Sequence, residues 1–151
     1  MLGWLMGLVF PACAAIGAAG LPPPSLIDFA ALVRPDTPNT ALAAPDRATP
    51  VAPDIALAPF PVPPARLRQA VRAVAPADGA FEEPSTGGQD HWVARSKLFN
   101  FPDLITAEVS GTDHSSRLIL WSRSVYGRSD LGVNRARLER WIAAIRKDLA
   151  P

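Results

Sequence analysis

The chain contains one cysteine, Cys13, so no disulfide can form within it. Its two histidines, His91 and His114, lie far apart in the sequence and far from Cys13, which excludes the ligand spacing of a zinc site. Lysine is also scarce, because Lys97 and Lys147 are the only two among 15 basic residues. The fold must therefore be held by packing, and the sequence predicts neither a metal nor another cofactor.

Sequence motifs of catalysis are missing as well. The chain has no nucleophile elbow, no glycine-rich phosphate loop and no paired-carboxylate pattern. The formal net charge is +1, and residues 65–151 hold 13 basic against 10 acidic residues. This balance lacks the dense basic stripe of a nucleic-acid-binding protein. The sequence therefore favours a non-catalytic domain and predicts no nucleic-acid partner.

Proline is concentrated in the first half of the chain. Twelve of the 17 prolines fall between Pro22 and Pro64. Because proline lacks an amide hydrogen and favours extended conformations, residues 21–63 are predicted to be an extended tether. Residues 64–151 then remain for a folded domain, which is a small but common size.

Residues 1–20 are predicted to be a separate membrane anchor or signal segment. The run Leu2–Ala19 carries no charge, and its length is at the lower limit for a bilayer span. It lacks the basic region that begins most secretory signals, although small-residue exit sites at Ala12–Ala14 and Ala18–Gly20 keep a cleaved signal peptide as an alternative. A buried core helix is a third alternative. The first two place the domain on the periplasmic side, either membrane-anchored or secreted.

The remaining residues predict an α+β fold. A helix is expected from Pro64, because Leu67, Ala70, Val71 and Val74 recur on one helical face. Strands are expected over residues 80–85, 91–98, 104–110 and 116–125. The last of these is apolar on both faces, which is typical of a central strand. We therefore expect a small antiparallel sheet of three to four strands with helices packed on one face.

The final helix is expected to begin at Asn134, a residue type that caps helix N-termini well. Val133 and Leu138 have the spacing of a hydrophobic staple around that cap. A buried face is then predicted, made by the following residues: Leu138, Trp141, Ile142, Ile145 and Leu149.

The turn before this helix concentrates polar and charged side chains. Helix N-termini expose unpaired amides and the positive end of the helix dipole, so they bind anions. We therefore predict a site for a small anion, such as a phosphate, a lipid head group or a carboxylate. Its candidate residues are Arg123, Arg128, Ser129, Asp130, Asn134 and Arg135.

Three alternatives to this site remain open. Asp130 can instead fix the turn by pairing with an arginine, with Gly127 and Gly132 supplying permissive backbone angles. A hydrolase-like enzyme would use Ser129 and Asp130. An interaction module would present the tether or an exposed sheet face to an envelope protein.

Three marks in the sequence resemble one family. They are Ser122–Arg137, which contains Gly-x-Ser-Asp-x-Gly-x-Asn-Arg, Val93–Asp103 and the short Pro38–Thr40. Together they resemble an uncharacterised family of bacteria and plants, domain of unknown function family 1499. The resemblance implies a secreted or membrane-anchored protein and no biochemical activity. The chain departs from the pattern at Val125, where many relatives have an arginine beside the one equivalent to Arg123.

Overall fold

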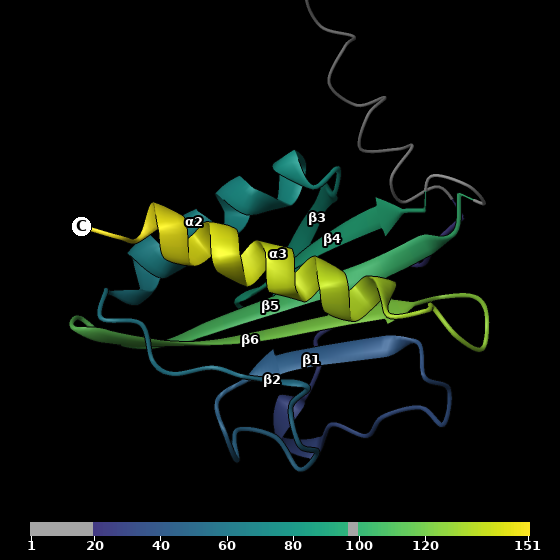
Figure 1. Cartoon of the computed structure of the whole chain (residues 1–151), viewed down its shortest axis with the longest axis horizontal. Helices are drawn as coiled ribbons and strands as arrows, with labels where there is room; N and C mark the ends of the chain where they lie inside the picture. The colour runs from purple at the N-terminus through teal and green to yellow at the C-terminus, as the bar shows by residue number, and fades with distance from the viewer. Residues whose placement is uncertain (1–19, 97–99) are drawn as a thin grey trace, which may run out of the picture.

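The protein is described here by a computed structural model covering residues 20–96 and 100–151. A six-stranded sheet of order β2-β1-β6-β5-β4-β3 carries helices α2 and α3 on one face (Figure 1). The elements are a 3-10 turn η1 (Phe29–Ala31), β1 (Thr40–Ala44), β2 (Ile55–Ala56), α2 (Pro64–Ala77), β3 (Phe81–Thr86), β4 (Gln89–Arg95), β5 (Pro102–Thr112), β6 (Ser115–Ser124) and α3 (Val133–Asp148). The predicted α+β fold with helices on one face is confirmed.

The sheet is larger than expected, with six strands rather than three or four. All neighbouring pairs are antiparallel except β1 and β2, which run parallel. The central position predicted for the segment around residues 116–125 is confirmed, because β6 lies between β1 and β5. Leu118 and Leu120 face the helices, whereas Ile119 and Trp121 face the opposite side.

The prediction of an extended tether over residues 21–63 is wrong for the part that forms β1. Thr40–Ala44 pairs with β6, and four of its five residues are buried. This run lies between Pro38 and Pro45 and contains no proline, so every amide can join the sheet. Strand propensity does not predict β1, because the segment is rich in alanine and alanine is depleted in strands. The folded domain therefore begins well before residue 64.

The main core lies between the helices and the sheet. The faces predicted for both helices are confirmed, with Leu67 and Val71 of α2 and Leu138, Trp141 and Ile145 of α3 fully buried. Ile105 and Ala107 of β5 lie opposite them. Fully burying side chains of this size stabilises the fold by about 1.5–3 kcal/mol each.

The start of α3 differs from the prediction. The helix begins at Val133, its N-cap is Gly132 with φ +82°, and Asn134 lies inside the first turn. The Asp130 carboxylate takes the capping position, because its Oδ2 accepts the Asn134 amide at 2.7 Å. Val133 is the first residue of the helix and is 46% exposed, so it does not occupy the position before the N-cap that the predicted staple with Leu138 requires. The cap is made by a residue four positions earlier than sequence indicated.

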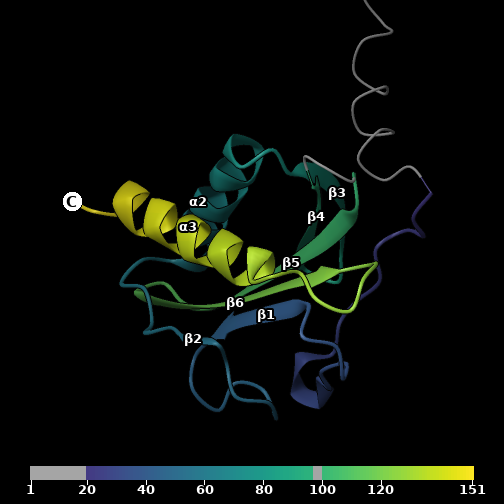
Figure 2. The ribbon, with the colours of Figure 1, turned by 45° about the vertical axis from the view of Figure 1, so that its right-hand side comes forward.

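The second face of the sheet is covered by the N-terminal part of the described chain. Phe29 and Leu32 pack with Leu42, Ile119 and Trp121 on this face. Residues 21–27, which we call the strap, continue from there across β4 and β5; Figure 2 shows the helices and this segment on opposite sides of the sheet. The sheet is therefore buried on both faces along its middle strands.

The predictions for residues 1–20 concern a segment that lies outside the described residues up to Ala19. Within residues 20–96 and 100–151, no helix is long and apolar enough to cross a membrane.

Candidate ligand cavity

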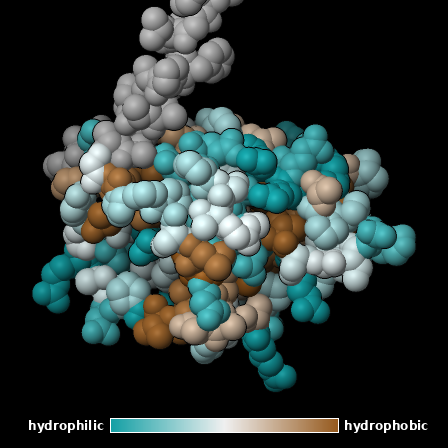
Figure 3. All heavy atoms as spheres, turned by 180° about the vertical axis from the view of Figure 1, so that it is seen from behind, coloured by the Kyte–Doolittle hydropathy of each residue, from teal (hydrophilic) through white to brown (hydrophobic). Residues whose placement is uncertain are grey.

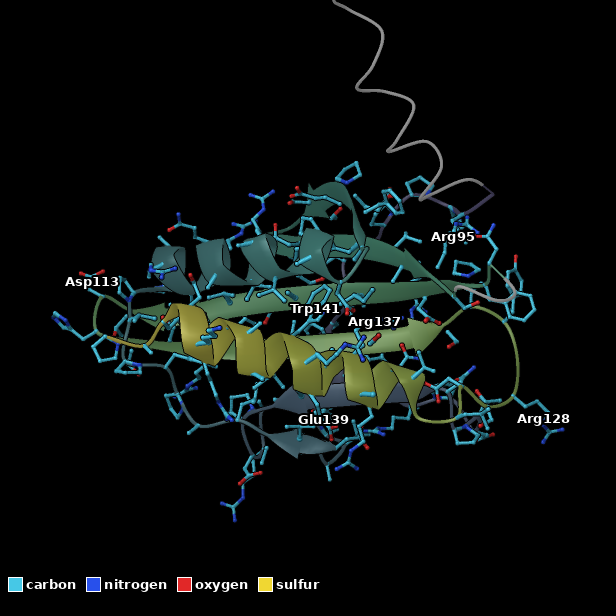
Figure 4. All side chains as sticks on the ribbon, turned by 45° about the horizontal axis from the view of Figure 1, so that its top comes forward. Arg95, Asp113, Arg128, Arg137, Glu139 and Trp141 are labelled. Carbon is cyan, nitrogen blue, oxygen red and sulfur yellow. The ribbon has the colours of Figure 1, made fainter. Side chains whose placement is uncertain are left out.

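The structure does not gather the six predicted anion-site residues at one point. Arg123 lies on the strap face of β6, where it lines a cavity and an adjoining groove. Arg128 projects from the turn into solvent (Figure 4). Arg135 pairs with Glu139 one turn along α3, with Nε 3.1 Å from Oε1.

The amides that would bind an anion at the start of α3 are already occupied. The Asp130 carboxylate accepts the Gly132 amide at 3.0 Å and the Asn134 amide at 2.7 Å. The Ser129 hydroxyl accepts the Leu131 amide at 3.2 Å. An external anion would have to displace a carboxylate held by the same turn. This arrangement favours the alternative in which Asp130 fixes the turn, although it does so through amides and not through an arginine.

Asn134 instead points into a buried polar network beneath α3. Its Nδ2 donates to the Asn39 carbonyl at 3.0 Å and to Ser124 Oγ at 2.9 Å. Its Oδ1 accepts from Ser122 Oγ and from Arg137 Nη1. Both hydrogen-bonding groups of the amide are satisfied within the fold, so Asn134 has a structural role.

Arg137 forms the charged centre of this network. Its Nη2 lies 2.8 Å from Asp103 Oδ2, and both side chains are 6% exposed. Its Nε lies 3.6 Å from Asp78 Oδ2 at the end of α2. The three marks of the sequence thus meet here, since Asn39, Asp103 and Asn134 each come from a different one. Much of the sequence signature therefore encodes a junction between β1, β5, β6 and α3.

A partly open cavity lies on the opposite face of the sheet, between the strap and β3–β6. Its volume is about 90 Å³, room for roughly three water-sized groups. Figure 3 shows this face of the molecule from behind, with apolar and hydrophilic surface intermixed. Its walls are mostly apolar, and its polar lining residues are Ser25, Glu83, His91, Thr106 and Arg123.

Strand register brings these polar residues together. Glu83, His91 and Thr106 form one continuous row across β3, β4 and β5. Arg123 stands opposite Leu104, one row further along, and so reaches the cavity from the side of β6. Neighbouring side chains in such a row have Cβ atoms about 5 Å apart.

Two buried polar atoms at this cavity have no hydrogen-bond partner among the described residues. They are His91 Nε2 and Glu83 Oε1. The other ring nitrogen, His91 Nδ1, lies 3.1 Å from Thr106 Oγ1, which fixes the ring. A buried polar atom left unpaired costs about 1–3 kcal/mol, so such atoms usually bind water, an ion or a ligand, or take part in a reaction.

Burial also displaces the ionisation of both groups. Loss of hydration lowers the pKa of His91, opposed by the nearby Asp90 charge, so the neutral ring is favoured. Burial raises the pKa of Glu83, so its protonated form persists to higher pH. The cavity thus holds a neutral imidazole beside a carboxyl group that resists ionisation.

The strap is fastened over the cavity by Gln89. The Gln89 side chain accepts the Ile27 amide at 2.9 Å and donates to the Ile27 carbonyl at 2.7 Å, as a neighbouring strand would. Its Nε2 also donates to Glu108 at 2.8 Å. These contacts hold Ile27, which lines the cavity, against β4. The cavity adjoins a surface groove, with which it shares Leu21, Pro22 and Arg123.

The His91 environment predicts a pH dependence of stability. Because its pKa is lower in the folded state, the unfolded chain binds more protons, and stability should fall as pH decreases through about 6.5. The contribution of His91 to the free energy of unfolding changes by at most about 1.4 kcal/mol per pH unit. Glu83 acts in the opposite sense, because the folded state takes up its proton first.

Urea unfolding of two variants between pH 5 and 7.5 separates the contribution of His91 from that of Glu83. We expect His91→Gln to remove the loss of stability at low pH that is predicted for the parent chain, and Glu83→Gln to make that loss steeper. His114→Gln is the matched control, since His114 is exposed in the turn between β5 and β6. Identical pH profiles for His91→Gln and His114→Gln would contradict the burial of a neutral imidazole.

Comparison with known proteins gives a family and no activity. The family described as "Protein of unknown function (DUF1499)" matches residues 33–145. Among curated proteins, none matches the chain. The crystal structure of TTHA0849 from Thermus thermophilus shows 11% identity and a TM-score of 0.32, covering 73% of this chain and 93% of that one.

Proposed function

The chain belongs to the DUF1499 family of proteins of unknown function, and we propose that its folded part binds a small organic anion in the cavity under the strap. The observation that carries this proposal is the pair of unpartnered polar atoms, His91 Nε2 and Glu83 Oε1, in the cavity that Arg123 also lines. The predicted ligand class is thereby kept, and its site moves from the turn before α3 to the opposite face of the sheet.

The chemistry of the lining describes the ligand. A guanidinium recognises a carboxylate or phosphate through two parallel hydrogen bonds. Within the described residues, no carboxylate lies within salt-bridge distance of Arg123, so its charge remains for a ligand. His91 and Glu83 suit a second polar group, such as a hydroxyl or a carbonyl. The groove beside Arg123 accommodates any part of the ligand that the cavity is too small to hold.

Calorimetric titration of the full chain in neutral nanodiscs tests this proposal. The probes are lactate, succinate and glycerol 3-phosphate, with acetate as an anion that lacks a second polar group. We expect at least one of the first three to bind more tightly than acetate. Arg123→Gln should weaken that binding by about tenfold or more, because a hydrogen bond to a charged group is worth about 1.5–3 kcal/mol.

Two control variants locate the site. Arg117 lies on the same strand and the same face as Arg123 but does not line the cavity, so Arg117→Gln should leave binding unchanged. Arg135→Gln tests the turn before α3. Equal losses from Arg117→Gln and Arg123→Gln, a loss confined to Arg135→Gln, or no heat with any probe would refute the cavity as the site.

The same proposal places the domain in the cell envelope, attached through residues 1–20. The uncharged run Leu2–Ala19 supports this placement, because it ends directly before the strap. A reporter fused after Pro151 tests it without interrupting β1. A reporter that is active only in the cytoplasm would refute the placement.

The two other functions receive less support. A hydrolase using Ser129 and Asp130 would need a base nearby, but His91 lies on the other face of the sheet, and His114 lies in the turn between β5 and β6. Asp130 is also engaged with two amides. An envelope protein as partner would be recognised by exposed surface, and not by the cavity.

A further inference from the structure

Exposed apolar side chains gather at one end of the sheet. Among the described residues, seven large hydrophobic side chains are exposed, and five of them lie just before β5, in the turn between β6 and α3, or at the first residue of α3. These five, which we call the strand-end patch, are Phe101, Val125, Tyr126, Leu131 and Val133. Isolated exposed apolar residues are ordinary on protein surfaces, whereas a cluster marks an interaction site.

The patch is held together by contacts between its two segments. The rings of Phe101 and Tyr126 meet edge to face with centroids 5.9 Å apart. The Val125 amide donates to the Pro102 carbonyl at 3.0 Å. Arg95 and Arg128 lie at this end of the molecule, whereas Asp113 lies at the opposite end (Figure 4). The patch therefore combines aromatic and aliphatic side chains with positive charge.

Leu131 is the residue that folding explains least. It is 94% exposed, so it contributes nothing to the core. Its φ of +54° is in the left-handed region, where a leucine is unfavourable and a glycine or asparagine is comfortable. A side chain that is both unburied and strained is better explained by a contact outside the domain than by stability.

The N-terminal part of the chain reaches the domain beside this patch. Leu21 and Pro22 line the same groove as Val125 and Gly127. The 18 uncharged residues Leu2–Ala19 end two positions before Leu21. If those residues enter a bilayer, the short connection keeps the strand-end patch within a few residues' length of the lipid surface.

We infer that the strand-end patch docks on the head-group region of an anionic lipid bilayer. Tyr126 and Phe101 suit the interface between water and hydrocarbon, where aromatic side chains concentrate, and Leu131 inserts its apolar side chain. Arg128 contacts lipid phosphates, because an anionic membrane surface attracts cationic side chains near it. This inference rests on the envelope placement in the proposed function, and it does not depend on the ligand cavity.

Site-specific fluorescence quenching of the full chain tests the inference. Cys13→Ser removes the only cysteine, so single reporters can be placed at Ser129→Cys in the turn or at Asp113→Cys at the far end. The protein is reconstituted into vesicles of phosphatidylcholine alone or mixed with phosphatidylglycerol, each carrying a nitroxide lipid. We expect the reporter at position 129 to be quenched at least twice as strongly as the one at 113, and more strongly in the anionic vesicles.

Two further variants separate docking from folding. Leu131→Asn should keep or raise the melting temperature, because asparagine tolerates the left-handed region, yet it should lower the quenching at position 129. Arg128→Glu should weaken docking by about fivefold or more in anionic vesicles. Equal quenching at positions 113 and 129, or quenching indifferent to both variants, would overturn the inference.

The experiments distinguish failure of the ligand-cavity proposal from failure of the docking proposal. Loss of organic-anion binding in the Arg123→Gln protein leaves the quenching at position 129 unchanged if docking is correct. Absence of quenching with intact ligand binding refutes the docking alone. Failure of the full chain to float with either kind of vesicle refutes the docking and the anchoring together.

Discussion

Replacing Arg137 by alanine is expected to lower the free energy of unfolding by about 3–5 kcal/mol. The substitution removes a guanidinium that lies 2.8 Å from Asp103 and leaves that carboxylate buried without its counter-charge. It also removes donors to Ser122 at 3.2 Å and to Asn134 at 3.0 Å. Urea unfolding followed by far-ultraviolet circular dichroism measures the loss.

Arg140 supplies the matched control, because it lies nearly one turn further along α3. Arg140 also pairs with Asp78, at 2.8 Å, but its side chain is 57% exposed. Exposed ion pairs contribute about 0–1 kcal/mol, so Arg140→Ala should shift the unfolding midpoint only slightly. Equal shifts for the two alanine variants would contradict the importance of burial at Arg137.

Removal of both charges distinguishes an unpaired charge from lost packing. In the double variant Arg137→Met with Asp103→Leu, neither buried charge remains. Replacement of a buried ion pair by apolar residues of similar size is often neutral or stabilising. We therefore expect the double variant to recover much of the stability that Arg137→Ala loses.

This network shows what the sequence predicted and what it could not. The crowding of arginine, serine, aspartate and asparagine before α3 did identify residues with unusual roles. This crowding led to the prediction of an external ligand, because the partners of these residues within the fold come from distant segments of the chain. Asn39 lies 95 positions from Asn134, and Asp103 lies 34 positions from Arg137. Sequence patterns report local periodicity, whereas the identity of a distant partner depends on strand order and register.

The cavity could not be predicted from the sequence for a different reason. A tight turn at Gly87 and Gly88 would pair Thr86 with Gln89 and then place Glu83 opposite Trp92. A register shift between Glu83 and Thr86 instead sets Glu83 opposite His91. One extra residue in a strand moves the following side chains to the other face, so the acidic group and the imidazole meet only because of this bulge. The prolines of the strap predict an extended tether, and nothing in the sequence indicates that this segment covers the two side chains.

Secondary structure was more accessible, since strong local periodicity determines it. The buried faces of both helices follow directly from apolar spacing, because the residues that recur at helical intervals face the same core. The sequence did not predict β1, because this strand is short and rich in alanine and is covered on both faces. Alternation disappears when both faces of a strand are buried.

Replacing Trp141 by alanine is expected to cost about 3–5 kcal/mol, as large aromatic-to-alanine changes in cores do. Trp141 is fully buried and meets Trp92 edge to face, with ring centroids 5.5 Å apart. Its indole Nε1 donates to Asp78 at 3.1 Å, so the same side chain joins α3 to the end of α2. Because domains are stable by only about 5–15 kcal/mol, the variant should melt at a much lower temperature than the parent chain.

Trp141→Phe separates the ring from the hydrogen bond. Phenylalanine keeps most of the contact with Trp92 but cannot donate to Asp78, so we expect a loss of about 1–2 kcal/mol. The Asp78 carboxylate keeps other partners in this variant, because it also accepts a hydrogen bond from Arg140 and lies near Arg137. Thermal melting by circular dichroism measures both substitutions. An alanine variant that melts with the parent chain would mean that the two helices hold together without the indole, and the assignment of Trp141 to the centre of the core would be wrong.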